Sequence, residues 1–252
     1  MTYFVDKNSI VRQIWGKSDT VLFIFAGAAA EFALNKAVDW LYFTGRLPAD
    51  PIGRLFSTVS YSKKILFAEY DHALKIIDSI SSIHRSIETK RGESIPAWAY
   101  RDVLFMLIYY SIASYETLER KLTDKEKDDV FDVFFRFGKR MQLENLPDTY
   151  SDWLTMRAHD LKRDLAKSDH SVDLYKQYKK HLGSFRYRVL IEGQIIVVPD
   201  EVRTLLNFRK FSFLTLFLPF YKLSRRLHMD SAIKALILPG KYKKEIEALN
   251  VV

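Results

Sequence analysis

Apolar residues recur every three or four positions along almost the whole chain, and this pattern restricts it to a helical fold. Steps of three and four place side chains on one face of an α-helix. The spacing predicts helices over 19–43, 52–69, 71–88, 98–120, after Thr123, from Pro147 to about Ala166, and over 171–182. Only 9 glycines and 7 prolines are present, which argues against a turn-rich all-β fold. We therefore predict an all-α, multi-helix bundle of about eight to ten helices.

Several helix ends carry local signals. Ser18 or Asp19 is expected to cap the first long helix, and Thr123 is followed three residues later by Glu126, the capping-box spacing. Gly183 is expected to end the helix over 171–182. The segment 187–198 fits a strand pair or a buried helix, and we favour the helix because no other strand partner is visible.

Composition excludes several classes of protein. No cysteine is present, which excludes disulfides, cysteine-bound zinc, iron–sulfur clusters, and haem bound through a thiolate or attached covalently to cysteine. The net charge of +8 comes from interspersed basic and acidic residues, so it allows an anionic partner surface but predicts no nucleic acid. No linker or repeat divides the 252 residues, so one domain over 1–252 is expected.

Two apolar runs are candidate membrane segments. The run from Val21 to Ala30 ends at Glu31, is far shorter than the roughly 20 residues of a membrane span, and predicts a buried helix. The run from Phe211 to Tyr221 lies in a basic, aromatic segment, 206–228, that fits either a buried helix with solvated ends or a peripheral membrane contact. The first of these is favoured. No signal peptide is evident, so a cytoplasmic location, with peripheral contact to a membrane as an alternative, is expected.

His84 lies on the apolar stripe of the helix over 71–88. It follows Ile80 by four residues and precedes Ile87 by three, so it should point from that stripe into the core. A buried imidazole needs a partner for each nitrogen. A neighbouring carbonyl is the partner that helix spacing alone favours, and a haem iron is the alternative.

Arg54 and Thr58 share one helix face with Tyr61 and Ile65. They are one turn apart near the start of the helix over 52–69, where backbone N–H groups favour anions, so they could bind a carboxylate or propionate. The structural alternative is that Arg54 pairs with Asp50 and that Thr58 bonds its own helix backbone.

The order of these pieces resembles a known family. The loop DPIGRL leads into Arg54 and Thr58, Ile83–His84 follows about 26 residues later, and the segments IPAWAYRDVLFML, SIASYETLERKLTDKEKDDVFDVFFRFGKRM and LP-x-x-Y come next. Together they resemble the rubber-oxygenase catalytic-domain family over roughly residues 10–225. This family includes bacterial latex-clearing proteins and the fungal endoplasmic-reticulum oxygenase of mycophenolic acid biosynthesis.

The resemblance implies a globin-related helical core around a non-covalent haem b. It makes His84 the iron ligand and places Arg54 and Thr58 in the haem pocket. The chain also departs from the family. Ser57 stands where latex-clearing proteins have a lysine that can occupy the sixth iron position, so an open or water-filled sixth site is expected. Val38 and Asp39 stand where those enzymes have a catalytic glutamate, and the helix DVLFMLIYYSI lacks a histidine that many relatives carry.

Three functional hypotheses follow. The first is a haem b-dependent oxygenase or related oxidoreductase that uses dioxygen or peroxide on a small apolar substrate. In it His84 holds the iron, Arg54 and Thr58 donate hydrogen bonds in the pocket, and Asp39 moves protons. The second is a non-catalytic haem carrier or gas sensor on the same scaffold. The third is a cofactor-free helical protein that docks to membranes through the segment from Phe208 to Arg226.

Overall fold

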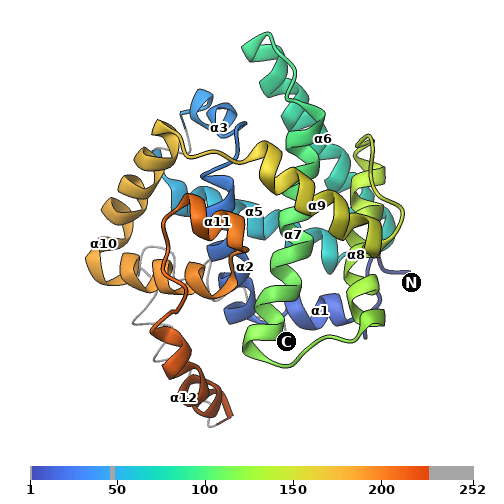
Figure 1. Cartoon of the computed structure of the whole chain (residues 1–252). Helices are drawn as coiled ribbons and strands as arrows, with labels where there is room; N and C mark the ends of the chain where they lie inside the picture. Colours follow the sequence, from blue (N-terminus) through green and yellow to red (C-terminus); the bar gives the residue numbers. More distant parts are fainter. Residues whose placement is uncertain (1, 46–48, 227–252) are drawn as a thin grey trace.

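Helices account for all the regular structure in the described part of the chain (Figure 1). The computed structural model describes residues 2–45 and 49–226. Within them the helices are α1 (Ile10–Trp15), α2 (Ser18–Phe32), α3 (Asp39–Phe43), α5 (Pro51–Leu66), α6 (Tyr70–Arg91), α7 (Ala97–Leu118), α8 (Asp124–Arg140), α9 (Tyr150–Asp164), α10 (Asp169–Val197), α11 (Asp200–Leu205) and α12 (Leu214–Arg226). The all-α prediction is confirmed for these residues, and eleven helices replace the predicted eight to ten.

The predicted helix over 19–43 is wrong, because the chain leaves the helix after Phe32. The backbone N–H of Lys36 donates to the carbonyl of Asp164, and that of Ala166 donates to the carbonyl of Leu34. Asn35 donates from its side chain to Asp102, at 2.9 Å. These tertiary bonds take backbone groups that would otherwise continue the helix. The predicted cap is also wrong, since the helix begins at Ser18 with Lys17 in the cap position and no side-chain cap bond.

The other local signals are confirmed. Thr123 and Glu126 form the capping box at the start of α8, where the N–H of Thr123 donates to the Glu126 carboxylate at 2.9 Å. Gly183, at φ 72°, ends the first half of α10, and the chain then resumes as a helix. That second half contains the ambiguous segment, which is therefore helical. Residues 46–48 of the predicted loop before α5 lie outside the described residues.

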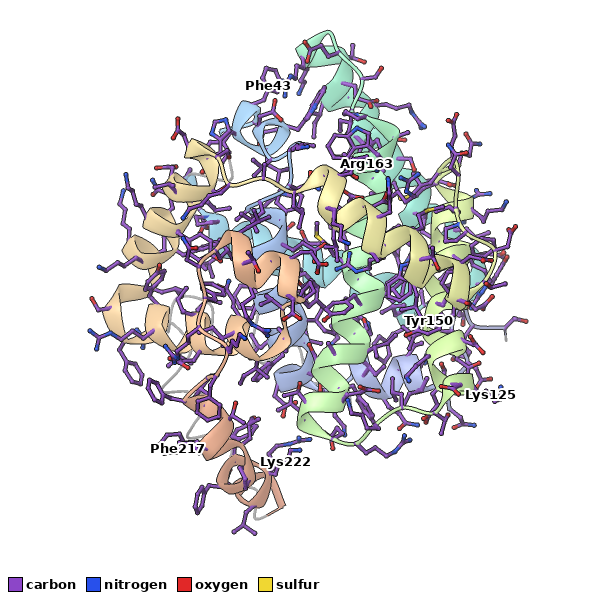
Figure 2. The ribbon with its side chains drawn as sticks, in the orientation of Figure 1. Phe43, Lys125, Tyr150, Arg163, Phe217 and Lys222 are labelled. Carbon is purple, nitrogen blue, oxygen red and sulfur yellow. The ribbon has the colours of Figure 1, made fainter. Side chains whose placement is uncertain are left out.

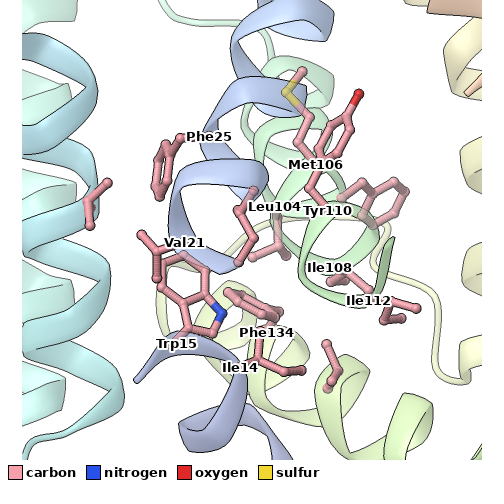
Figure 3. Packing of buried hydrophobic residues seen from close by; sticks show 14 of the residues in the cluster. Ile14, Trp15, Val21, Phe25, Leu104, Met106, Ile108, Tyr110, Ile112 and Phe134 are labelled. Atoms are coloured by element: carbon pink, nitrogen blue, oxygen red, sulfur yellow. The ribbon is translucent and has the colours of Figure 1, made fainter. Parts of the chain in front are cut away.

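The core is built around the contact between α2 and α7, with α1 and α8 closing one side (Figure 3). Trp15, Phe105 and Tyr110 are among its largest fully buried side chains. Gly27 allows the close approach of the two helices, because a Cβ there would lie 2.2 Å from the ring of Tyr110. The run from Val21 to Ala30 is thus the buried helix that its composition predicts, and α7 is central, as its few charges indicate.

A buried ion pair crosses this core. Arg157 of α9 donates to both carboxylate oxygens of Glu31 on α2, at 2.9 and 2.6 Å, and the hydroxyl of Tyr110 on α7 donates to the same carboxylate at 2.9 Å. All three side chains are buried. Glu31, the residue that ends the apolar run from Val21, therefore ties three helices together.

α12 extends from the rest of the molecule at one end (Figure 1). Its side chains Phe217 and Lys222 lie at that end in Figure 2, and Phe217 is 62% exposed. The expectation of a buried helix over 211–221 is therefore wrong. Residues 227 and 228 of the predicted C-terminal helix lie outside the described residues. None of the described helices is both long enough and apolar enough to cross a bilayer.

Candidate functional site

A cavity of about 330 Å³ lies among α2, α5, α6, α7 and α8. Its walls are mostly apolar and include Phe25, Phe32, Trp40, Leu55, Ile65, Ile80, Ile87, Val103, Leu104, Leu107, Phe134 and Phe137. Sites for small molecules and cofactors are commonly of this size and kind, with a few polar groups that fix the orientation of the ligand. The polar side chains in this wall therefore identify the candidate site.

Two of these polar groups come from the first turns of α5. Asp50 caps the helix by accepting a hydrogen bond from the N–H of Gly53, and Pro51 occupies the first turn, where it needs no donor. This start places Arg54, Thr58, Tyr61 and Ile65 on the cavity wall, which confirms that they share one face. Arg54 donates to the Thr58 hydroxyl at 3.4 Å, and that hydroxyl donates to the Arg54 carbonyl at 3.2 Å.

His84 approaches the same cavity from α6. It lines the wall together with Ile80 and Ile87, as the helical stripe predicts. Its Nδ1 is buried and has no hydrogen-bond partner among the described residues, so the expected carbonyl partner is missing at this nitrogen. Burial lowers the pKa of the imidazole, and the charge of Arg54 lowers it further, against the opposing effect of Glu88. The ring is therefore neutral near pH 7, the form that binds metals.

Glu88 and Tyr100 support His84 from the side. The ring of Tyr100 lies 5.1 Å from that of His84, and its hydroxyl donates to Glu88 at 3.2 Å. The same Glu88 oxygen accepts from the backbone N–H of Ile95, at 2.8 Å, which fixes the turn between α6 and α7. Sequence reasoning did not single out either residue. The signal was present, since Glu88 is one helical turn after His84 and Tyr100 lies in the aromatic segment of the family resemblance.

Asp39 is placed differently from the other predicted site residues. Its carboxylate accepts from Arg91 at 2.8 Å, and Arg91 also stacks on Trp40. Trp40 lines the cavity, whereas Asp39 is not one of its lining residues. The structure thus brings Arg54, Thr58 and His84 together and leaves Asp39 outside. Among the described residues that line the cavity there is no aspartate or glutamate.

A second polar cluster lies outside the cavity. Asp102, Asp160 and Asp164 are buried, with one oxygen of each within 4.8 Å of the others. Arg101 and Arg163 bind Asp160, and Arg163 also binds Asp164. Asp102 accepts from Asn35, and its second oxygen, Oδ1, has no partner among the described residues. Burial, reinforced by Asp164 and Asp160, raises the pKa of Asp102 to about 7.

This raised pKa predicts how Asp102→Asn changes stability with pH. Asp102 loses its proton near pH 4 in the unfolded chain but only near pH 7 in the folded one. Its contribution to stability is thus complete below pH 4 and is lost as the pH rises from about 4 to about 7. Asparagine stays neutral. We expect the free energy of unfolding of the variant, relative to that of the wild type, to rise by about 2–3 kcal/mol between pH 5 and pH 8, because about two pH units separate pH 5 from the folded pKa. Urea unfolding at the two pH values measures this change. A difference that does not change with pH would contradict this assignment.

The cavity lies within a part of the chain that matches a known protein family. The sequence model of the family described as ER-bound oxygenase mpaB/B'/Rubber oxygenase, catalytic domain, matches residues 13–229. The match includes α5, α6 and α7, which carry the polar wall of the cavity. No curated protein matches the chain.

Proposed function

Because this chain belongs to the family of ER-bound and rubber oxygenase catalytic domains, we propose that it is a haem b-dependent oxygenase acting on a small apolar organic substrate. One observation carries the proposal. His84, with a buried and unbonded Nδ1, lies in the wall of a large apolar cavity, and Arg54 and Thr58 line the same cavity from the neighbouring helix. Family membership supports an oxygenase, and the cavity supports the choice of cofactor.

The residues present fit a haem. The neutral imidazole of His84 would bind the iron, and the apolar walls would pack against the flat macrocycle. Arg54 would bind a propionate through charge-assisted hydrogen bonds. Haem, when bound, supplies an iron centre able to activate dioxygen or peroxide. A globin-related arrangement of helices around the haem remains part of this proposal.

The protein's own contribution is to bind, orient and exclude water. The apolar wall would hold a substrate of matching polarity, such as a terpenoid, a lipid or a phenol, and keep bulk water out of the site. Arg54 supplies polar hydrogens on one side of the cavity, and the Thr58 hydroxyl, whose own hydrogen goes to the Arg54 carbonyl, supplies an acceptor there. A role for Asp39 in proton transfer stays a prediction, and its bond to Arg91 would have to open for it. Ser57 is exposed and does not line the cavity.

An isotope experiment tests the reaction. Haem-loaded protein is incubated under ¹⁸O₂ with squalene or with a simple phenol, and the products are analysed by mass spectrometry. The proposal predicts products that contain ¹⁸O and that form only with active haem protein. Stoichiometric haem binding without any oxygenated product from these probes would contradict the oxygenase assignment.

A haem carrier or gas sensor is the second candidate function. It is favoured by the composition of the cavity wall, which lacks a carboxylate among its described residues. Acid–base steps in oxygenation commonly use such a group. Ferrous protein that binds carbon monoxide reversibly, yet leaves both probe substrates unchanged, would favour this alternative.

Arg54→Leu is expected to weaken haem binding without changing the iron ligand. A hydrogen bond to a charged group contributes about 1.5–3 kcal/mol, so we expect the dissociation constant of haem to rise by at least about tenfold. The position of the Soret band should not move, because His84 is retained. Titration of the apoprotein with haem measures both quantities.

Ser57→Ala is the matched control for Arg54→Leu. Ser57 lies on the same helix, is exposed and does not line the cavity. Its replacement should leave haem affinity unchanged. Equal affinities of the Arg54→Leu variant and the wild type would exclude a role of Arg54 in binding the cofactor.

A further inference from the structure

The last described helix, α12, is amphipathic in the reverse of the usual sense. Its polar face is turned toward the protein. Tyr221 donates to Asp19 at 3.2 Å, and Arg225 binds both Asp19, at 3.2 Å, and Glu119, at 2.6 Å. Asp19 belongs to α2, and Glu119 follows the end of α7. The contacts that attach α12 to the body are therefore largely polar.

The opposite face of α12 is apolar and exposed. It consists of Leu216, Phe217, Phe220 and Leu223, with Phe213 directly before the helix. These five side chains are between 54% and 69% exposed, and we call them the α12 apolar face. Their spacing of three and four residues places them on one stripe of the helix. Single exposed apolar residues are ordinary on protein surfaces, whereas a contiguous stripe marks a site of interaction.

The segment that leads into α12 is fixed in place. Glu192 of α10 accepts from the Ser212 hydroxyl at 2.7 Å and from the backbone N–H of Phe213 at 2.8 Å. Arg209 binds the same carboxylate. Together with those of Tyr221 and Arg225, these bonds hold the helix near both ends. The apolar face is therefore already folded and exposed before any partner binds.

The charge of this segment identifies the kind of surface that it fits. Residues 206–226 contain five basic residues and no acidic one, in a chain of net charge +8. Lys210 is exposed beside the start of the stripe, and the partly exposed Lys222 lies on α12 on the side of the helix away from Phe220. Basic residues beside an apolar helical face are attracted to anionic lipids, whereas a second copy of the same surface would bring like charges together.

We propose that the α12 apolar face docks onto an anionic phospholipid bilayer. The 13 residues of α12 are too few to cross the hydrocarbon core, so the helix lies in the plane of the interface. Its aromatic and leucine side chains enter the boundary between head groups and acyl chains. Lys210 contacts lipid phosphates, and Lys222 adds to the electrostatic attraction from the other side of the helix. Arg225 stays bound to Asp19 and Glu119. This surface acts independently of the haem assignment.

Vesicle flotation of the full chain tests the proposal. The probes are vesicles of phosphatidylcholine with about 30% phosphatidylserine, the anionic content that gives the surface its attraction, and vesicles of phosphatidylcholine alone. We expect the wild type to float with the first and less with the second. Phe217→Ser with Phe220→Ser should reduce binding at least tenfold. Lys210→Glu with Lys222→Glu should reduce it by about fivefold or more per residue and remove the preference for phosphatidylserine.

Phe43→Ser is the matched control. Phe43 is also an exposed phenylalanine, but it lies at the other end of the molecule from Phe217 (Figure 2), so its loss should not change flotation. Circular dichroism checks that each variant folds. Failure of the wild type to float, or unchanged binding of the double phenylalanine variant, would overturn the proposal. A dimer in light scattering that dissociates in this variant, without flotation, would overturn it in favour of a second copy.

Discussion

His84→Ala is expected to lose haem almost completely. The side chain supplies the only imidazole in the cavity wall among the described residues, and its neutral form is favoured by burial and by Arg54. Without it the iron loses its protein ligand and only the apolar contacts of the macrocycle remain. We expect the haem content after purification with added haem to fall at least about tenfold, with loss of the Soret band of the wild type.

The control for this variant is His72→Ala. His72 lies on the same helix, α6, and is exposed. It should keep a normal haem content and spectrum. Added imidazole should restore part of the Soret band to His84→Gly, because the smaller residue leaves room for a free ligand. Wild-type spectra in His84→Ala would show that another group binds the iron.

Arg157→Leu is expected to have the largest effect on stability. The substitution leaves the buried carboxylate of Glu31 without its cation, and removal of one partner of a buried pair typically costs about 3–5 kcal/mol. We expect a fall of this size in the free energy of unfolding at pH 8, measured with urea.

A double variant separates the contribution of the ion pair to stability from that of side-chain packing. Glu31→Gln with Arg157→Leu removes both charges and keeps an acceptor for the hydroxyl of Tyr110. It should regain much of the lost stability. If the double variant lost as much free energy of unfolding as the two single variants together, the two side chains would not depend on each other.

The features predicted well from sequence are those set within one helix. The capping box at Thr123, the stop at Gly183 and the stripes that carry His84 and Arg54 depend on residues a few positions apart. These signals gave the all-α fold and three residues that meet in one cavity. The resemblance to the rubber-oxygenase family, which rested on the order of such pieces, is confirmed by the match over residues 13–229.

The features that sequence reasoning missed depend on partners far apart in the chain. The break after Phe32 exists because Asn35 bonds Asp102, and the burial of Glu31 exists because Arg157 reaches it from α9. Asp39 does not line the cavity and is bound by Arg91, 52 residues later. The exposure of Phe217 likewise depends on Arg225 meeting Asp19. A helical period in the sequence shows that a helix has an apolar face, but it does not show which other part of the chain packs against that face.

Resonance Raman spectroscopy of the ferrous, haem-loaded protein tests the central claim most directly, because it observes the bond between iron and its protein ligand. The account predicts an iron–imidazole stretching band that moves to lower frequency when the protein is labelled with ¹⁵N-histidine and that is absent from His84→Ala. A wild-type protein that takes up no haem, or haem-loaded protein without a band sensitive to the histidine label, would contradict it.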